Sequence, residues 1–152
     1  MVEIKMCNID EIMDMLDWNN SAEIQQRGIE IAKYIRSINA FVLPMNPSKS
    51  VWENCAKILV DKPDEILNPY LFRLLEWIED LNWPGALIVL DRLKKFTETE
   101  MLSFSVENIV RIASATNNSI WLGNLSELLD NENLIPVLSD DTLSKLKKHY
   151  NN

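Results

Sequence analysis

The 152-residue chain is poor in the residues on which several functional classes depend. It contains three glycines and one histidine. Three glycines leave little material for phosphate-binding loops or tight hairpin turns, and neither a Walker nor a Rossmann glycine pattern is present. One histidine makes most acid–base and metal-binding arrangements difficult to assemble. These scarcities weigh against nucleotide chemistry and against catalysis in general.

Cysteines and long apolar runs are scarce as well. Cys7 and Cys55 are far apart and form no metal-binding spacing, so we expect buried thiols in a reducing compartment. The longest apolar run, about Ala86 to Leu90, is far shorter than the ~20 residues that a membrane helix needs. The first residues lead into acidic positions without the apolar core of a signal peptide. We therefore expect a cytoplasmic protein with no membrane contact.

Positive charge is in short supply. The chain has 15 basic and 23 acidic residues, a net charge of −8, and a pI near 4.7. A nucleic-acid or anionic-membrane binder requires the opposite sign. The hydrophobic content of 47% is sufficient for a core and excludes a disordered chain. The length predicts a single domain over residues 1–152.

The apolar residues that are present recur with the helical period almost throughout the chain. No long stretch alternates with a period of two, so the sequence predicts an all-α fold. Ser21 or Asn20 is expected to cap the second helix, and a loop containing Pro44 and Pro47 is expected over residues 39–49. The predicted helical segments are 8–17, 21–38, one from about 48 or 50 to 62, 67–81, one from about 84, 99–115, one from about 118, and one after Ser139.

Polar corners containing asparagine recur along the chain. They are Trp18–Asn20, Leu81–Trp83 and Thr116–Asn118, and each lies between two apolar helical stripes. In each expected helix pair, the second helix starts near residue 20, 49, 83 or 118. Consecutive starts are therefore 29, 34 and 35 residues apart, which is about the length of one helix pair. This pattern favours an α-α superhelix of about eight helices, stacked as HEAT-like antiparallel pairs, and the alternative is a compact irregular bundle.

The most distinctive string in the chain runs from Leu74 to Ala86 and reads LLEWIEDLNWPGA. It resembles the L-L-x-W-(L/I)-x-D-x-N-W-P-x-A signature of a small bacterial family described as a domain of unknown function. The upstream segment Val42–Pro44, which leads into Ser50–Trp52, is also similar. The turn between them usually contains lysines and ends in aspartate, whereas here it reads MNPSKS over residues 45–50.

The resemblance covers about residues 42–130, and residues 1–40 have the pattern of an added N-terminal helix pair. It implies an α-helical, HEAT-like fold and no established activity. The departure at residues 45–50 removes any basis for assigning a role to that turn.

The same string contains the candidate site residues, and two interpretations of them stay open. In the first, the string is structural: Asp80 accepts a hydrogen bond from an indole N–H or from backbone amides at the next helix start, Asn82 or Trp83 caps that helix, and Pro84 occupies its first turn. In the second, an exposed carboxylate beside two tryptophans forms a recognition pocket. The candidate binding residues are Glu76, Trp77, Asp80, Asn82, Trp83 and Pro84.

Other charged groups offer little chemistry. Glu76 and Asp80 are four residues apart on a helix, but no histidine, nucleophile or metal set accompanies them. His149 lies too close to the C-terminus to be a promising base. Acidic clusters elsewhere are typical of solvated helix faces, although a continuous acidic ridge would steer a basic partner. We therefore predict no catalytic residue, no metal and no cofactor.

The leading hypothesis is a non-enzymatic protein-interaction module that binds a protein with a basic surface, in the manner of an immunity protein or antitoxin. One alternative is a HEAT-type DNA-repair protein similar to alkylpurine DNA glycosylases, which use tryptophans and an aspartate in a basic groove. The net charge of −8 argues against nucleic acid as the partner. Another alternative is a structural subunit of a larger complex. The oligomeric state does not follow from the sequence.

Overall fold

The computed structural model describes residues 8–42 and 48–150, and this part of the chain is helical and contains no strand. One-turn α5 continues through the 3₁₀ turn η3 (Asn68–Tyr70) into α6, so the expected number of about eight helices is confirmed. The α-helices are α2 (Ile9–Met15), α3 (Ala22–Ala32), α4 (Trp52–Val60), α5 (Asp64–Leu67), α6 (Leu71–Trp77), α7 (Ala86–Lys94), α8 (Thr99–Ala115), α9 (Ser119–Ser126) and α10 (Asp140–His149). Further 3₁₀ turns are η1 (Asn39–Phe41), η2 (Lys49–Val51), η4 (Glu127–Asp130) and η5 (Ile135–Val137).

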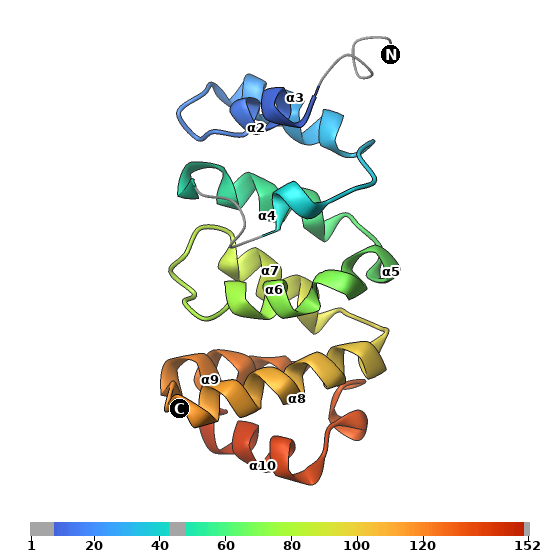
Figure 1. The fold of residues 1–152 in the computed structure, drawn as a ribbon, viewed down its shortest axis with the longest axis vertical. Helices are drawn as coiled ribbons and strands as arrows, with labels where there is room; N and C mark the ends of the chain where they lie inside the picture. Colours follow the sequence, from blue (N-terminus) through green and yellow to red (C-terminus); the bar gives the residue numbers. More distant parts are fainter. Residues whose placement is uncertain (1–7, 43–47, 151–152) are drawn as a thin grey trace.

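The helices are stacked along the long axis of the molecule in chain order, with α2 and α3 at one end and α10 at the other (Figure 1). Helix α3 packs on α4, α4 on α7, α6 on α8, and α9 on α10. One hydrophobic core extends through all layers, from Ile12 in α2 to Leu146 in α10. Each layer therefore buries its apolar stripe against its neighbours rather than around a single centre.

Several helix ends lie where local sequence signals place them. The Ser21 hydroxyl accepts a hydrogen bond from Ile24 N at 3.3 Å, and Asn118 Oδ1 accepts one from Trp121 N at 3.0 Å. Ser139 caps α10 in the same way. These caps satisfy amides that the first helical turn leaves without a partner. The boundaries of α8 agree with the predicted segment 99–115.

Two predicted helices are shorter than expected. Helix α3 ends at Ala32 and not near residue 38, and the Lys62 amino group donates to the carbonyl oxygens of Lys33 at 3.3 Å and Ile35 at 3.1 Å just beyond this end. The predicted segment 67–81 is interrupted at η3, which contains Pro69, and α6 ends at Trp77. Lys62 satisfies carbonyl oxygens that the end of α3 leaves without an amide partner, and the missing amide of Pro69 accounts for the interruption at η3.

Side chains from one layer also satisfy carbonyls at helix ends in the layer before it. Asn54 Nδ2 donates to Leu16 O at 2.7 Å, and Arg92 Nη2 donates to Lys62 O at 2.9 Å. Helix ends are polar, so these bonds allow consecutive layers to pack closely without leaving buried carbonyls unsatisfied. The same arrangement recurs at Trp121 to Leu75 O, Asn124 to Ile78 O, and Asn131 to Leu93 O and Phe96 O.

Some predicted features fall on residues that the structure does not describe. Cys7, Pro44 and Pro47 lie outside the described residues, as does the first half of the turn at 45–50. Cys55 is buried in the core, as expected. No helix within residues 8–42 and 48–150 is long and apolar enough to cross a bilayer.

Candidate functional site

The predicted site residues lie in and beside the loop 78–85, which connects α6 to α7. Trp77, the last residue of α6, is fully buried, and its indole N–H donates to the carbonyl oxygen of Pro84 at 2.9 Å. This bond closes the corner from the inside. Because its ring is inaccessible to a partner, Trp77 supports the site and does not contact a ligand.

Helix α7 starts differently from the prediction. Its N-cap is Gly85, at φ +82°, and no side chain caps the helix. Asn82 and Trp83 are therefore not caps, and Pro84 lies two residues before α7 rather than in its first turn. A Cβ at Gly85 would lie 2.8 Å from Ala56 Cβ, so the left-handed conformation and the close approach of α4 together require glycine here.

Asp80 holds the loop through the backbone. Its carboxylate accepts a hydrogen bond from Asn82 N at 2.8 Å, and its carbonyl oxygen accepts one from Trp83 N at 3.1 Å. Asp80 thus accepts a backbone amide, but this amide lies in the loop and not at the start of α7 as expected, and the indole N–H of Trp77 bonds elsewhere. Glu76 forms a partly exposed ion pair with Arg73 at 3.2 Å. Asp80, Asn82 and Trp83 are at least partly accessible at this corner.

Behind the corner lies an aromatic cluster. Trp52 of α4 makes edge contacts with Trp77 and Trp83, with centroid distances of 6.3 and 5.9 Å. The Lys49 amino group lies 5.6 Å from the Trp52 ring and 5.9 Å from the Trp83 ring. Sequence reasoning did not associate Lys49 with this site, because no local spacing connects residues 49 and 83. A cation above two indoles stabilises the contact between the η2 turn and the corner.

Direct contacts connect this corner with the corners of the neighbouring layers. Trp18 N donates to Ser50 O at 3.0 Å, Lys49 reaches Trp83, and Asn118 Nδ2 donates to Glu79 Oε1 at 3.0 Å. The α2–α3, α6–α7 and α8–α9 loops accordingly lie along one side of the molecule (Figure 1). We call this side the corner edge and define it as residues 17–19, 49–50, 79–83, 87 and 117–120.

Large apolar side chains project from the corner edge. Trp18 is 53% exposed, Leu87 63% and Ile120 72%. Trp18 falls in one of the predicted corners, whereas Leu87 and Ile120 were not predicted as part of any site. The signal for both was their position in the first turn of a helix, away from its buried stripe. Exposed apolar groups that gather along one side are typical of interaction surfaces.

A hollow of about 500 Å³ lies between the α6–α7 and α8–α9 corners. Glu79 contributes a carboxylate to it, and Ile112 and Ile120 contribute apolar walls. Glu79 also accepts the Asn118 hydrogen bond, and a carboxylate retains further acceptor positions after one such bond. The remaining residues that line the hollow are Thr116, Asn117, Asn118, Ser119 and Trp121.

A second carboxylate on the corner edge is fixed by hydrogen bonds. Asp17 accepts Asn19 N at 2.9 Å and the Ser50 hydroxyl at 2.9 Å. The bond from the Asn19 amide, followed by that from Ser50, lowers the pKa of the Asp17 carboxyl below its ordinary value. The group is therefore negatively charged at neutral pH.

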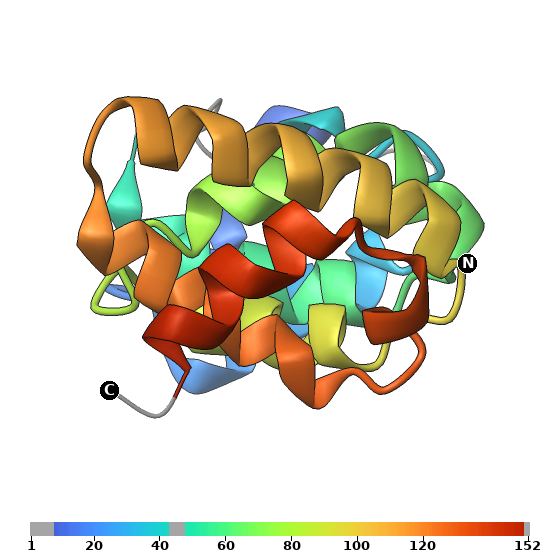
Figure 2. The same cartoon turned by 90° about the horizontal axis from the view of Figure 1, so that it is seen from below.

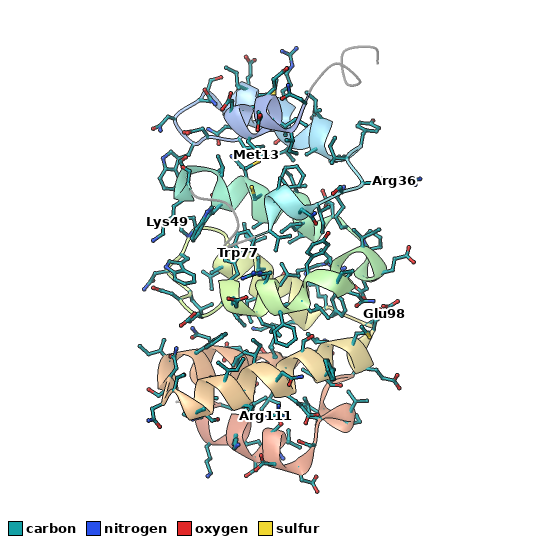
Figure 3. The ribbon with its side chains drawn as sticks, viewed as in Figure 1. Met13, Arg36, Lys49, Trp77, Glu98 and Arg111 are labelled. Atoms are coloured by element: carbon teal, nitrogen blue, oxygen red, sulfur yellow. The ribbon has the colours of Figure 1, made fainter. Side chains whose placement is uncertain are left out.

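The opposite side of the molecule is built around an ion pair. Asp64 lies 2.6 Å from Arg92 and accepts hydrogen bonds from the Thr97 amide and hydroxyl, both at 2.7 Å. Burial alone would raise the pKa of Asp64, but the bonds from Thr97, Arg92 and Glu98 N outweigh it and lower the pKa to about 2. This network connects the start of α5 with the start of α8. Figure 3 shows Glu98 on the side away from Lys49.

Residues 48–149 match the family model described as "Domain of unknown function (DUF5071)". The chain belongs to this family. The match includes the corner, the aromatic cluster and the hollow. No curated protein and no solved structure matches the chain. In the described part of the chain, no three His, Cys, Asp or Glu side chains are placed to hold a metal ion.

Proposed function

We propose that this chain is a non-enzymatic, HEAT-like protein-interaction module whose corner edge binds a protein with a basic surface. The observation that carries the proposal is the exposure of Trp18, Leu87 and Ile120 on three layers along one edge. Tryptophan and large aliphatic groups supply binding energy when a partner excludes water from them. A monomeric enzyme or a purely structural corner has no need to expose them together.

The layer packing supports the HEAT-like description. Second helices of consecutive layers pack on one another, as α4 does on α7, and first helices do the same, as α6 does on α8. Such stacking creates long edges on which each layer contributes one loop. A partner can then contact several layers at once, which suits the corner edge.

The chemistry of the hollow favours a lysine or arginine side chain as an anchor of the partner. Ile112 and Ile120 would pack along the aliphatic part of such a side chain, while Glu79 would accept its charged end. Asp17 and Asp80 add negative charge along the same edge. A basic partner is thus steered to this edge, whereas nucleic-acid phosphates would be repelled by it.

Within a bacterial cell, a small acidic binder of this kind would suit an immunity-like or antitoxin-like role. The net charge of −8 and the size of the chain support this assignment. A basic toxin domain and a basic region of a larger assembly would both present lysine or arginine side chains to the corner edge. The identity of the protein captured from the native host distinguishes them.

The test is an affinity capture from lysate of the native host, followed by titration of the recovered protein. Ile120→Ser removes an exposed anchor, and Glu79→Gln removes one charge while retaining an oxygen that accepts the Asn118 bond. We expect Ile120→Ser to weaken binding about tenfold or more, in the range of interface anchors. Tyr34→Ala is the matched control, because Tyr34 is similarly exposed but lies outside the corner edge.

Two results would refute the proposal. One is that no protein is captured by the wild-type chain under any ionic condition. The other is that Ile120→Ser and Glu79→Gln bind the recovered protein as tightly as Tyr34→Ala does. Tight binding of duplex DNA, with excision of an alkylated base that is lost on substitution of Asp80, would instead support the DNA-repair alternative.

A further inference from the structure

The outward face of α8 carries apolar side chains that the fold does not use. The opposite face of this helix is buried through residues such as Leu102, Val106 and Ile109. On the outward face, Met101 is 50% exposed, Phe104 66% and Ile112 47%. Figure 2 shows α8, the longest helix in the described part of the chain, along the outer margin of the molecule. A helix at the surface of a monomer needs only one apolar face, which packs on the core. The second apolar face of α8 is therefore typical of a contact surface.

Charged residues flank this stripe with a particular spacing. Glu100 and Arg111 are eleven residues apart on α8, and Met101 and Ile112 are also eleven residues apart. Eleven residues correspond to about three helical turns, so the members of each pair lie on the same side of the helix. Among the residues that the structure describes, neither Glu100 nor Arg111 forms an ion pair. Asn108 Oδ1 accepts a bond from Arg111 Nη1 at 3.0 Å, which holds the guanidinium beside the stripe.

We propose that a second copy of this chain docks on the outward face of α8, with the two α8 helices antiparallel about a two-fold axis near residue 106. The midpoint between residues 100 and 111 is 105.5, and the midpoint between residues 101 and 112 is 106.5. One axis position therefore brings Glu100 of each copy beside Arg111 of the other and Met101 beside Ile112. The two Phe104 rings lie close to the axis, about one turn apart.

Charge complementarity selects a second copy over other occupants of this face. The chain is strongly acidic, so two random surfaces of it repel each other. The α8 face instead presents one carboxylate and one guanidinium in a self-complementary order. In a two-fold contact each charge meets its opposite twice, as in the flanking positions of antiparallel coiled coils.

The dimer is expected to be weak. Helix α8 has 17 residues and is about 25 Å long, which is short for a stable interface. Contacts of this size belong to the transient class, and the two ion pairs are exposed to solvent and screened by salt. We therefore expect association at micromolar concentrations or above, and stronger association at low ionic strength.

Sedimentation of the full chain over a range of concentrations tests the proposal. Glu100→Arg and Arg111→Glu should each weaken the dimer about tenfold or more, because each substitution places like charges together twice. An equimolar mixture of the two variants should associate as well as the wild type does. In the mixed dimer the introduced arginine of one copy meets the introduced glutamate of the other, and the unchanged Arg111 meets the unchanged Glu100. Phe104→Ser should abolish association, and circular dichroism would verify that each variant is folded.

The proposal is overturned if the wild type stays monomeric at every concentration tested. It is also overturned if the dimer is insensitive to both charge reversals, or if the mixed variants do not recover association. Ile112 lines the hollow of the corner edge and also belongs to this face of α8, whereas Ile120 lies beyond the end of α8 at Ala115. Ile120→Ser should leave the monomer–dimer equilibrium unchanged, so the outcome is separate from that of the proposed partner binding.

Discussion

Replacement of Gly85 by alanine should be one of the most damaging single-methyl changes in the chain. The backbone at Gly85 has φ +82°, a region that costs an L-residue about 1–2 kcal/mol. The added Cβ would also lie 2.8 Å from Ala56 Cβ, 3.0 Å from Trp52 O and 3.1 Å from Trp77 Cζ2. Overpacking of this kind costs about 1–3 kcal/mol. The sum predicts a loss of about 2–5 kcal/mol in the free energy of unfolding.

Gly123→Ala is the matched control. Gly123 lies within α9, and a Cβ there would meet no atom within 4 Å. Alanine is a better helix former than glycine, so this variant should gain about 0.8–1 kcal/mol. Urea denaturation followed by circular dichroism measures both changes, and the melting temperature should fall by about 2–4 °C for each kcal/mol lost. Equal stability of Gly85→Ala and wild type, or a similar loss in both variants, would refute this reasoning about the corner.

Three further changes probe contacts between layers and within the α6–α7 corner. Asp64→Asn should reduce the free energy of unfolding at neutral pH by about 2 kcal/mol, because folding lowers the pKa of the Asp64 carboxyl from 3.8 to about 2. Acid titrations of unfolding should show this difference from wild type disappearing as the pH falls from about 4 to 2. Asn131→Ala should cost about 2–4 kcal/mol in urea denaturation, since two buried helix-end carbonyls lose their donor. Trp77→Phe should cost about 1–3 kcal/mol in the same assay through loss of the bond to Pro84 O.

Each of these changes has an informative contrary result. A stability difference between wild type and Asp64→Asn that persists at pH 2 would show that the carboxylate hydrogen bonds are not its source. For Asn131, the control is Asn133→Ala, which removes an exposed side chain, and equal losses for the two would contradict the role given to the buried amide. Unchanged stability of Trp77→Phe would mean that ring packing alone holds the corner.

The helical class and several boundaries were predictable because their causes are local. The period of apolar residues acts within a few turns, and it located α8 at residues 99–115. The caps Ser21, Asn118 and Ser139 bond to amides three residues ahead, so the sequence contains both partners of each bond. The contiguous string Leu74–Ala86 suggested a family described as a domain of unknown function, and residues 48–149 match the model of a family so described.

The candidate site was predictable only in part. Asp80 bonds a nearby amide as expected, but the choice of Gly85 as N-cap depends on the approach of α4, about 30 residues earlier in the chain. Trp77 and Trp83 are both tryptophans of the same short string, yet the fold buries Trp77 and leaves Trp83 partly accessible. Burial is a property of neighbouring layers, which local spacing does not encode.

By itself, the sequence determined that the chain forms helices, where many of them begin, and that their corners are polar and contain asparagine. Only the tertiary structure decided that these corners align on one edge, that Lys49 covers two tryptophans there, and that Ile120 and Leu87 remain exposed. The physical reason is the range of the interactions. Helix formation and capping act over three or four residues, whereas the edge is assembled from contacts between residues about 30 to 40 positions apart.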